Sequence, residues 1–382
     1  MRKAFGRRSV SMVVASGLVS ITLNAFACPF CGVVGRSLAE RRDTASAVAV
    51  GEATGSPTNS PDGRSLQPCT IRQLIRGDAA PGEIVLARVE GPLSGLALLF
   101  RDGDGPTARW SAVAADETLL GHVAAAPGIK EPAGERLAWF AQRLEHPNPA
   151  IAADAFTEFG LAPFTAVRTA ATAFDASLLR AWVLEPGITQ QRRGLYGLLL
   201  GITAEHASES AERRASIAAL RDAIEAPASD FRTGIDGIMG GVLVAEGEQG
   251  LDYLEGRGLL GKTARPVDQR QLLAALRFAW ENLPARIPQP RIATATAVLA
   301  LSPAVAADAV IDLARYEAWE ATDAVAGLWD TAGKDDPLVR RAIAGYLTTC
   351  PMPRARVLLD RLRAADPDRL KAAVDAISLP AR

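Results

Sequence analysis

The residues best able to do chemistry in this chain are four cysteines, two of which are closely spaced. Cys28 and Cys31 form a Cys-x-x-Cys motif, whereas Cys69 and Cys350 are isolated. A thioredoxin-type redox site requires a strand before its Cys-x-x-Cys motif, and a four-thiolate metal site requires a second pair. We therefore expect Cys28 and Cys31 to form a local disulfide. Ligation of a metal or haem, redox chemistry, lipidation of Cys28 and pairing with Cys69 are the alternatives.

Residues 1–27 have the pattern of a cleavable signal peptide. Basic residues at positions 2, 3, 7 and 8 precede the apolar stretch 9–23, and Ala25-Phe26-Ala27 fits the small-x-small cleavage rule. A bilayer-spanning helix needs about 20 apolar residues, so this stretch is too short to be one. We expect export to the periplasm or the extracellular space, where thiols oxidise, and a mature chain that begins at Cys28. A twin-arginine signal at Arg7-Arg8 and a lipoprotein anchored at Cys28 are alternatives.

The segment 256–263 has the spelling of a phosphate-binding loop. It reads GRGLLGKT and satisfies both G-x-G-x-x-G and G-x-x-x-x-G-K-[ST]. Such a loop binds phosphate only between a buried strand and a helix that starts at once. The preceding residues are acidic and helical in pattern, and Pro266 follows closely. We therefore expect a connection between two helices here, and we expect no cofactor.

Other short motifs are typical of turns or of the hydrophobic core. Arg76-Gly77-Asp78 and Asp102–Gly105 both predict tight turns. The second begins like a calcium-binding loop, but Pro106 stands at the fifth position, where such a loop needs a ligand. The three histidines, at 122, 146 and 206, have no metal-ligand spacing, and most of the six tryptophans lie in helical stripes. We identify no catalytic and no metal-binding residue, although carboxylate chemistry stays open because 43 Asp and Glu residues are present.

The segment from about Ala45 to Val113 predicts a small β-structure. Apolar runs with Gly, Pro and Asp turns between them recur at short intervals, which is typical of a small barrel or sandwich. The expected strands are Ala45–Ala53, Cys69–Ile75, Glu83–Val89, Leu96–Arg101 and Thr107–Val113. The Asp102–Gly105 turn predicts a hairpin between the last two.

From about Lys130 the pattern is helical almost to the end of the chain. A capping side chain followed by proline, typical of a helix start, occurs at Asn148-Pro149, Ser302-Pro303, Asp336-Pro337 and Asp366-Pro367. Each expected helix is amphipathic and needs neighbours, which favours antiparallel pairs stacked side by side. Residues 148–151 and 336–339 are alike, and this pattern resembles the second-helix signature of HEAT-like repeats.

Two family resemblances extend this interpretation. Residues 47–51, 69–78, 81–85 and 98–100 resemble a netrin-like or metalloprotease-inhibitor-like module, which implies an OB-type barrel after an N-terminal cysteine motif. That family begins Cys-x-Cys, whereas this chain has Cys-x-x-Cys. The whole chain resembles a group of planctomycete exported proteins through Cys28–Gly32, the segment 145–149 and the segment 192–199. This second resemblance implies architecture only.

Together these patterns predict an α+β protein of several domains. We expect a signal peptide at 1–27, a small OB- or netrin-like β-barrel at 28–115 and a HEAT-like α-helical solenoid at 130–382. The 382 residues carry a net charge of −1, which gives no basic footprint for nucleic acid, and we expect no membrane span. The expected function is non-catalytic binding of a protein or peptide of the cell envelope through the helical surface. The alternative is an extracytoplasmic hydrolase or protease inhibitor that uses surface carboxylates or the β-domain.

Overall fold

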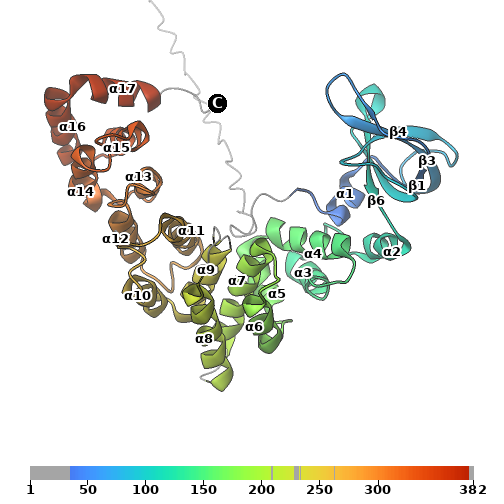
Figure 1. Cartoon of the computed structure of the whole chain (residues 1–382), viewed down its shortest axis with the longest axis horizontal. Helices are drawn as coiled ribbons and strands as arrows, with labels where there is room; N and C mark the ends of the chain where they lie inside the picture. The colour runs from blue at the N-terminus through green and yellow to red at the C-terminus, as the bar shows by residue number, and fades with distance from the viewer. Residues whose placement is uncertain (1–34, 208–209, 228–231, 233, 262, 378–382) are drawn as a thin grey trace, which may run out of the picture.

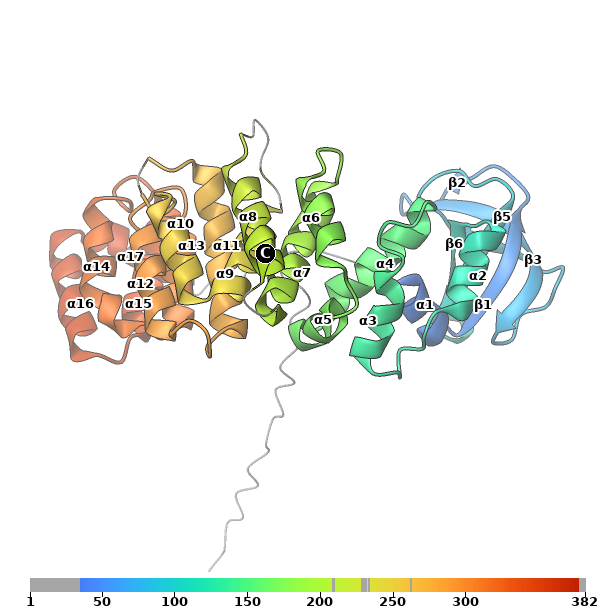
Figure 2. The same ribbon diagram turned by 90° about the horizontal axis from the view of Figure 1, so that it is seen from below.

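The computed structural model describes residues 35–207, 210–227, 232, 234–261 and 263–377. It shows an α+β protein in which a small five-stranded barrel precedes many helices. Figure 1 shows the helices following one another along an arc, with the barrel at one end and the last helix at the other. The view in Figure 2 shows the same order from barrel to final helix along the long axis. The predicted succession of a β-barrel and a helical region is therefore confirmed.

The barrel closes through antiparallel pairs and one short parallel pair. Its strands are β1 (Ala47–Ala53), β2 (Thr58–Asn59), β3 (Ser65–Arg76), β4 (Ile84–Arg88), β5 (Leu96–Asp102) and β6 (Arg109–Ala114). Their order is β1-β5-β6-β4-β3, and β3 pairs with β1 to complete the circle, while β2 only extends β3. The β4–β6 pair is the single parallel one and joins two residue pairs, Ala87 with Trp110 and Arg88 with Ser111. The barrel is therefore weakest between β4 and β6.

Alternation along the strands separates two apolar clusters. Ala49, Cys69, Val85 and Leu99 point into the barrel interior. Val48, Leu98 and Phe100 lie on the opposite faces of β1 and β5 and pack against helices. These helices are α1 (Leu38–Thr44) and α2 (Glu117–Ala125), neither of which the sequence pattern predicted. The β1-β5-β6 wall of the barrel is thus covered, because both faces of its strands carry apolar side chains.

The remaining helices form two layers along the arc. They are α3 (Ala133–Ala141), α4 (Pro149–Leu161), α5 (Phe164–Ala171), α6 (Ala176–Leu184), α7 (Gln190–His206), α8 (Ala211–Glu225), α9 (Ile235–Glu246), α10 (Glu248–Gly256), α11 (Pro266–Asn282), α12 (Gln289–Leu299), α13 (Ala306–Arg315), α14 (Thr322–Gly327), α15 (Pro337–Thr349), α16 (Pro353–Ala365) and α17 (Pro367–Ile377). Figure 1 places α7, α9, α11, α13 and α15 along the inner side of the arc and α6, α8, α10, α12, α14 and α16 along the outer side. Short 3₁₀ turns occur at Gly105–Thr107, Trp319–Ala321 and Leu328–Asp330.

Three of the four predicted proline helix starts are confirmed. Helices α4, α15 and α17 begin at Pro149, Pro337 and Pro367, and Asn148 and Asp336 cap the first two with their side chains. The fourth prediction is wrong, because α13 begins at Ala306 rather than Pro303. The hydroxyl of Ser302 is buried and donates to Gln269 Oε1 at 2.6 Å, so it does not act as a cap.

Helices α7 and α9 pack backbone against backbone at the middle of the arc. A Cβ added to Gly241 would lie 2.2 Å from the carbonyl oxygen of Gly197, and one added to Gly201 would lie 2.2 Å from that of Gly241. Glycine permits this approach because it has no Cβ. The apolar stretch 195–204 of α7 and most of α9 are buried, so this pair forms the centre of the helical core.

Candidate functional site

The cysteine prediction lies outside the part of the chain that the structure describes, since Cys28 and Cys31 precede residue 35. Cys69 and Cys350 are both free and buried. Cys69 points into the barrel interior, where burial raises the pKa of its thiol. Cys350 follows α15 in the last part of the helical region, next to Thr322.

The segment 256–263 connects two helices, as predicted. Helix α10 ends at Gly256, turns follow to Gly261, and α11 begins at Pro266; Lys262 lies outside the described residues. The carbonyl oxygen of Gly261 accepts a hydrogen bond from the side chain of Gln269 at 3.0 Å. The element before the loop is a helix and not the strand that a phosphate-binding loop requires.

The two predicted turns and the three histidines are also placed. Arg76-Gly77-Asp78 turns the chain at the end of β3, and Gly77 adopts a φ of +91°. Residues 102–105 lie in the hairpin between β5 and β6. His122 is buried and its Nε2 atom lies 2.9 Å from the carboxylate of Asp154. The rings of His146 and His206 form hydrogen bonds with main-chain groups two and four residues away in the chain. Among the described residues, no three His, Cys, Asp or Glu side chains gather as a metal site would need.

The tryptophans pack as predicted. Trp329 is buried in the helical core, and Trp139, Trp182, Trp280 and Trp319 pack against its edge. Trp110 is different, because it leans against the barrel interior and also borders a groove. This groove was not predicted from the sequence.

The groove, which we call the barrel groove, has a volume of about 840 Å³ and lies across the β4–β6 seam. Its walls come from α1, β3, β4 and β6 and the residues next to them, from the connection 89–93, and from the last residue of β5. The lining residues are Arg36, Arg41, Arg64, Leu66, Leu86, Arg88, Val89, Glu90, Gly91, Leu93, Asp102, Arg109, Trp110, Ser111, Ala112, Val113 and Ala114.

The barrel groove is positively charged. Five arginines and two carboxylates line it, and a third carboxylate, Asp62, is 3.2 Å from Arg64. One carboxylate, Asp102, is 3.0 Å from Arg36. Arg41 donates to Ser111 Oγ at 2.9 Å and stacks on the Phe100 ring at 3.9 Å, and its burial lowers its pKa. Arg88 has no ion-pair or side-chain hydrogen-bond partner within the described ranges, so its charge faces solvent.

The walls of the barrel groove also carry uncovered apolar side chains. The outward side chains of β4 are Ile84, Leu86 and Arg88, of which Ile84 is 67% and Leu86 59% exposed. Leu86 lines the groove, and Leu66 of β3 lies beside Arg88 in the strand register. Large exposed aliphatic side chains next to a charged groove are typical of interaction surfaces.

A buried glutamine holds the connection that follows β4. Gln67 is 2% exposed; its side chain donates to the carbonyl oxygens of Gly55 and Leu93 and accepts from the Leu93 N–H, each at 2.8 Å. These bonds hold the connection after β4 against β3. Because that connection turns toward β3, β6 has no neighbouring strand beyond its pair with Arg88.

A buried polar network fixes α1 beside the groove. Ser37 caps α1 by accepting from the Glu40 N–H at 3.0 Å and donates its hydroxyl to Glu158. The Leu38 N–H donates to Asp154 at 2.6 Å, and the second carboxylate oxygen of Asp154 is 2.9 Å from His122 Nε2. Barrel, α1, α2 and α4 are thereby tied together, and Arg36 and Arg41 are held over the groove.

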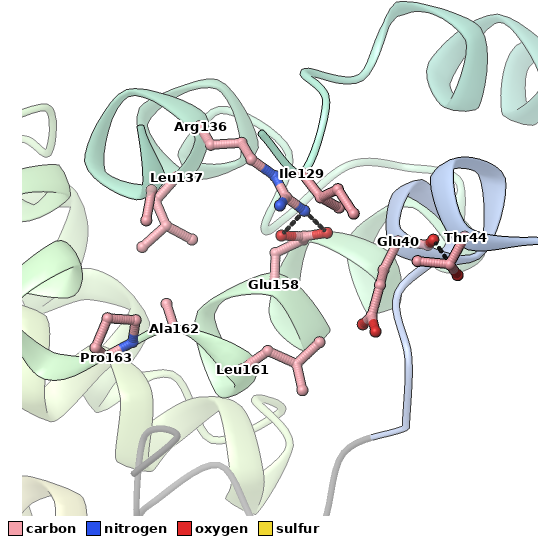
Figure 3. A pocket seen from close by; sticks show the side chains of 10 residues that line it. Glu40, Thr44, Ile129, Arg136, Leu137, Glu158, Leu161, Ala162 and Pro163 are labelled. Atoms are coloured by element: carbon pink, nitrogen blue, oxygen red, sulfur yellow. Dashed lines mark hydrogen bonds and ion pairs between the residues drawn. The ribbon is translucent and has the colours of Figure 1, made fainter. Parts of the chain in front are cut away.

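A second, smaller pocket lies on the other side of α1 and has a volume of about 280 Å³. Figure 3 shows Arg136 of α3 donating to both carboxylate oxygens of Glu158. Glu40 and Thr44 of α1 approach from the opposite side, and Leu137, Leu161, Ala162 and Pro163 supply apolar walls. Burial raises the pKa of Glu158. Its two oxygens are occupied by Ser37 and Arg136, so its role here is to hold the elements together.

Two carboxyl groups with raised pKa lie at the ends of α11 and α13. Burial is the main cause for both Glu281 and Asp312; the charge of Asp312 further raises the pKa of Glu281, and the charge of Asp308 that of Asp312. Asp312 is 1% exposed and accepts from Arg277 Nε at 2.5 Å. The ring of Tyr316 stacks on Trp280 beside them at 4.0 Å. The buried ion pair takes up Asp312, so this cluster stabilises the helix packing.

Comparison of the chain with protein-family models, with curated proteins and with solved structures gives no match in any of the three. Among the described residues, no helix combines the length and apolar character that crossing a membrane requires. Sequence reasoning missed the barrel groove because five segments far apart in the chain build it. One signal was available: the run Ile84–Ala87 is apolar on both faces, which indicates that its outer face contacts something.

Proposed function

We propose that this protein is an exported, non-catalytic binding protein that takes a protein or peptide ligand in its barrel groove. The observation that carries the proposal is the barrel groove itself. Its volume of about 840 Å³ allows room for an extended segment, five arginines and two carboxylates line it, and exposed aliphatic side chains border it. This combination of charge and apolar area suits a protein segment, because such segments bind through both.

The proposal moves the expected binding surface from the helices to the barrel. Large exposed apolar residues on the helical region, such as Leu178, Leu338 and Val357, are distributed over several helices. Single exposed apolar residues are normal on a protein surface. The pockets found on the helices are smaller than the barrel groove.

We assign the barrel to the OB type and the helices to a HEAT-like solenoid as part of the same proposal. The strand order supports the first assignment: with β2 set aside, the first strand pairs with the second and fourth, and the third and fifth pair in parallel. The alternation of inner and outer helices along the arc supports the second (Figure 1). In this arrangement the helical arc carries the barrel and presents a second surface to partners.

Location in the periplasm or extracellular space rests on the signal-peptide pattern of residues 1–27. Intact-mass measurement of the secreted protein is expected to show a chain beginning at Cys28. A form that keeps Met1 in the cytoplasmic fraction would contradict export.

Site-specific photocrosslinking tests the binding site. A photoreactive residue placed at Leu86 in the barrel groove is expected to give a discrete adduct in cells that make the protein. The same residue at Leu338, which is 64% exposed on α15, serves as the matched control. Adducts at Leu338 and none at Leu86 would place binding on the helices and refute the proposal.

A further inference from the structure

The edge of β6 beyond its pair with Arg88 faces the barrel groove with main-chain groups that no strand uses. The Ala115 N–H donates to the Leu96 carbonyl at 3.0 Å, which fixes the phase of the β5–β6 ladder. Residues of an antiparallel strand alternate between bonding to one neighbour and facing away from it. Val113 therefore bonds to β5, whereas the N–H and C=O groups of Ala112 and Ala114 point to the opposite side, toward the groove.

The strand that pairs with β6 on that side is β4, and it ends before it reaches all of these main-chain groups. Its last pair joins Arg88 to Ser111 and takes up the Ala112 N–H. Gln67 then holds the following connection at Leu93. The Ala112 carbonyl and both main-chain groups of Ala114 lie beyond this pair. Ala114 is exposed and lines the barrel groove. Within the described ranges its N–H and C=O have no main-chain or side-chain partner. An unpaired strand edge of this kind is a template for another strand.

From this geometry we infer that the barrel groove binds an extended, acidic peptide segment of a partner protein as an added β-strand along β6. The inference rests on the proposed function and adds the binding mode and the chemistry of the ligand. Main-chain hydrogen bonds to the Ala112 carbonyl and to the N–H and carbonyl of Ala114 supply the pairing, and alternate side chains of the added strand point to opposite sides.

Charge selects the ligand. Five arginines against two carboxylates line the groove, and Arg88 stands at the point where β4 stops pairing with β6. Side chains that point outward from the added strand would pass Arg88 and Arg41, which favours Asp and Glu at alternate positions. Leu86 and Val113 lie beside them and favour apolar residues between the acidic ones.

The first test measures binding of a fluorescent peptide of four Glu-Val repeats to the full chain. We expect saturable binding that weakens at least tenfold for four Lys-Val repeats. We also expect a tenfold loss for the Glu-Val peptide with N-methyl groups on alternate residues, because these remove the main-chain donors without changing the charge. Equal binding of the methylated and unmethylated peptides would overturn strand addition.

The second test changes the protein. Ala114→Pro removes only the N–H that faces the groove and leaves the β5–β6 bonds in place, so we expect normal thermal unfolding and a loss of peptide affinity of at least tenfold. Glu117→Pro is the matched control, since position 117 is the first residue of α2, where proline is tolerated. We expect that variant to bind like the unmodified protein. Unchanged binding by Ala114→Pro would refute the inference.

The design separates failure of this inference from failure of the proposed function. If the Leu86 adduct forms and is lost in Arg88→Glu but kept in Ala114→Pro, the groove binds a ligand without strand addition. Arg356→Glu on α16, an exposed position far along the chain, controls for the change in total charge. If no adduct forms at Leu86 at all, the proposed function fails and strand addition fails with it.

Discussion

The side-chain amide of Gln67 is joined to Leu93 by two hydrogen bonds of 2.8 Å, one to its N–H and one to its carbonyl oxygen. The side chain of Gln67 thus bonds the N–H and the C=O of one residue, as the main chain of a paired strand would. The connection after β4 is held toward β3, and the seam between β4 and β6 stays open. Leu93 is one of the residues that line the barrel groove, so this contact fixes part of its wall.

Replacing Gln67 is expected to destabilise the barrel. Gln67→Ala leaves the buried main-chain groups of Leu93 and the Gly55 carbonyl without their partner, and an unsatisfied buried group costs about 1–3 kcal/mol. We expect urea unfolding to show a loss of about 2 kcal/mol in the free energy of unfolding. Gln73→Ala, at an exposed position on the same strand, should change it by less than about 0.5 kcal/mol. Equal effects of the two substitutions would show that the Gln67–Leu93 contact carries no stability.

The contact between α7 and α9 predicts strong intolerance to a single methyl group. Gly241→Ala would place a Cβ against the Gly197 carbonyl oxygen and force the helices apart, at a cost of about 3 kcal/mol. Gly121→Ala in α2 meets no atom within 4 Å and should instead stabilise by about 0.5–1 kcal/mol. Thermal unfolding of both variants measures the difference. Similar melting temperatures would contradict backbone contact between α7 and α9.

The Arg136–Glu158 pair predicts strong coupling in a double-mutant cycle. Arg136→Ala leaves a buried carboxylate with a raised pKa and no charged partner, and breaking such a pair costs about 3–5 kcal/mol. Replacing both residues, Arg136→Ala with Glu158→Leu, should cost clearly less than Arg136→Ala alone, because no buried charge remains. Chemical denaturation of Arg136→Ala, Glu158→Leu and the double variant provides the comparison. Additive losses would show that the two side chains act independently.

Asp236 predicts a specific dependence of stability on pH. Burial raises its pKa to about 6 from the ordinary value of 3.8, so between these pH values the folded state binds more protons than the unfolded chain. The free energy of unfolding should therefore decrease as the pH rises from about 4 to about 6. Above this range Asp236 should cause no further change. Asp236→Asn should remove this dependence and raise the free energy of unfolding at pH 7 by about 2 kcal/mol.

Asp308→Asn is the matched control for Asp236, since both aspartates lie in the first turn of an inner helix and Asp308 is exposed. We expect that variant to keep the slope between pH 4 and pH 6. A stability curve of Asp236→Asn that runs parallel to that of the unmodified protein would refute the assignment.

Local sequence patterns were sufficient for most of the fold. The strands β4 and β5 lie within about one residue of their predicted ranges, and the caps at Asn148 and Asp336 mark true helix starts. These features depend on alternation and on capping, which act between near neighbours in the chain. The prediction at Ser302 failed because a long-range partner, Gln269, takes its hydroxyl.

The site depends on long-range contacts that local patterns do not encode. Helix α1 is short, and its position is set by buried bonds from Ser37 to Glu158 and from Leu38 to Asp154, more than 110 residues away. The charge of the barrel groove comes from arginines that the sequence presents as scattered. Only the two-sided apolar character of β4 pointed to an occupied outer face.

The amide of Ala114 offers the most direct test of the account. Residue-resolved hydrogen–deuterium exchange is measured for the full chain, alone and with the Glu-Val peptide, and Val113 serves as the internal reference. We expect the Ala114 N–H to exchange rapidly in the free protein and to become protected when the peptide binds, because it then donates to an added strand. The Val113 N–H, which bonds to β5, should be protected in both states. An Ala114 amide that is already protected in the free protein, or that stays unprotected in the complex, would contradict an open β6 edge that binds an extended partner.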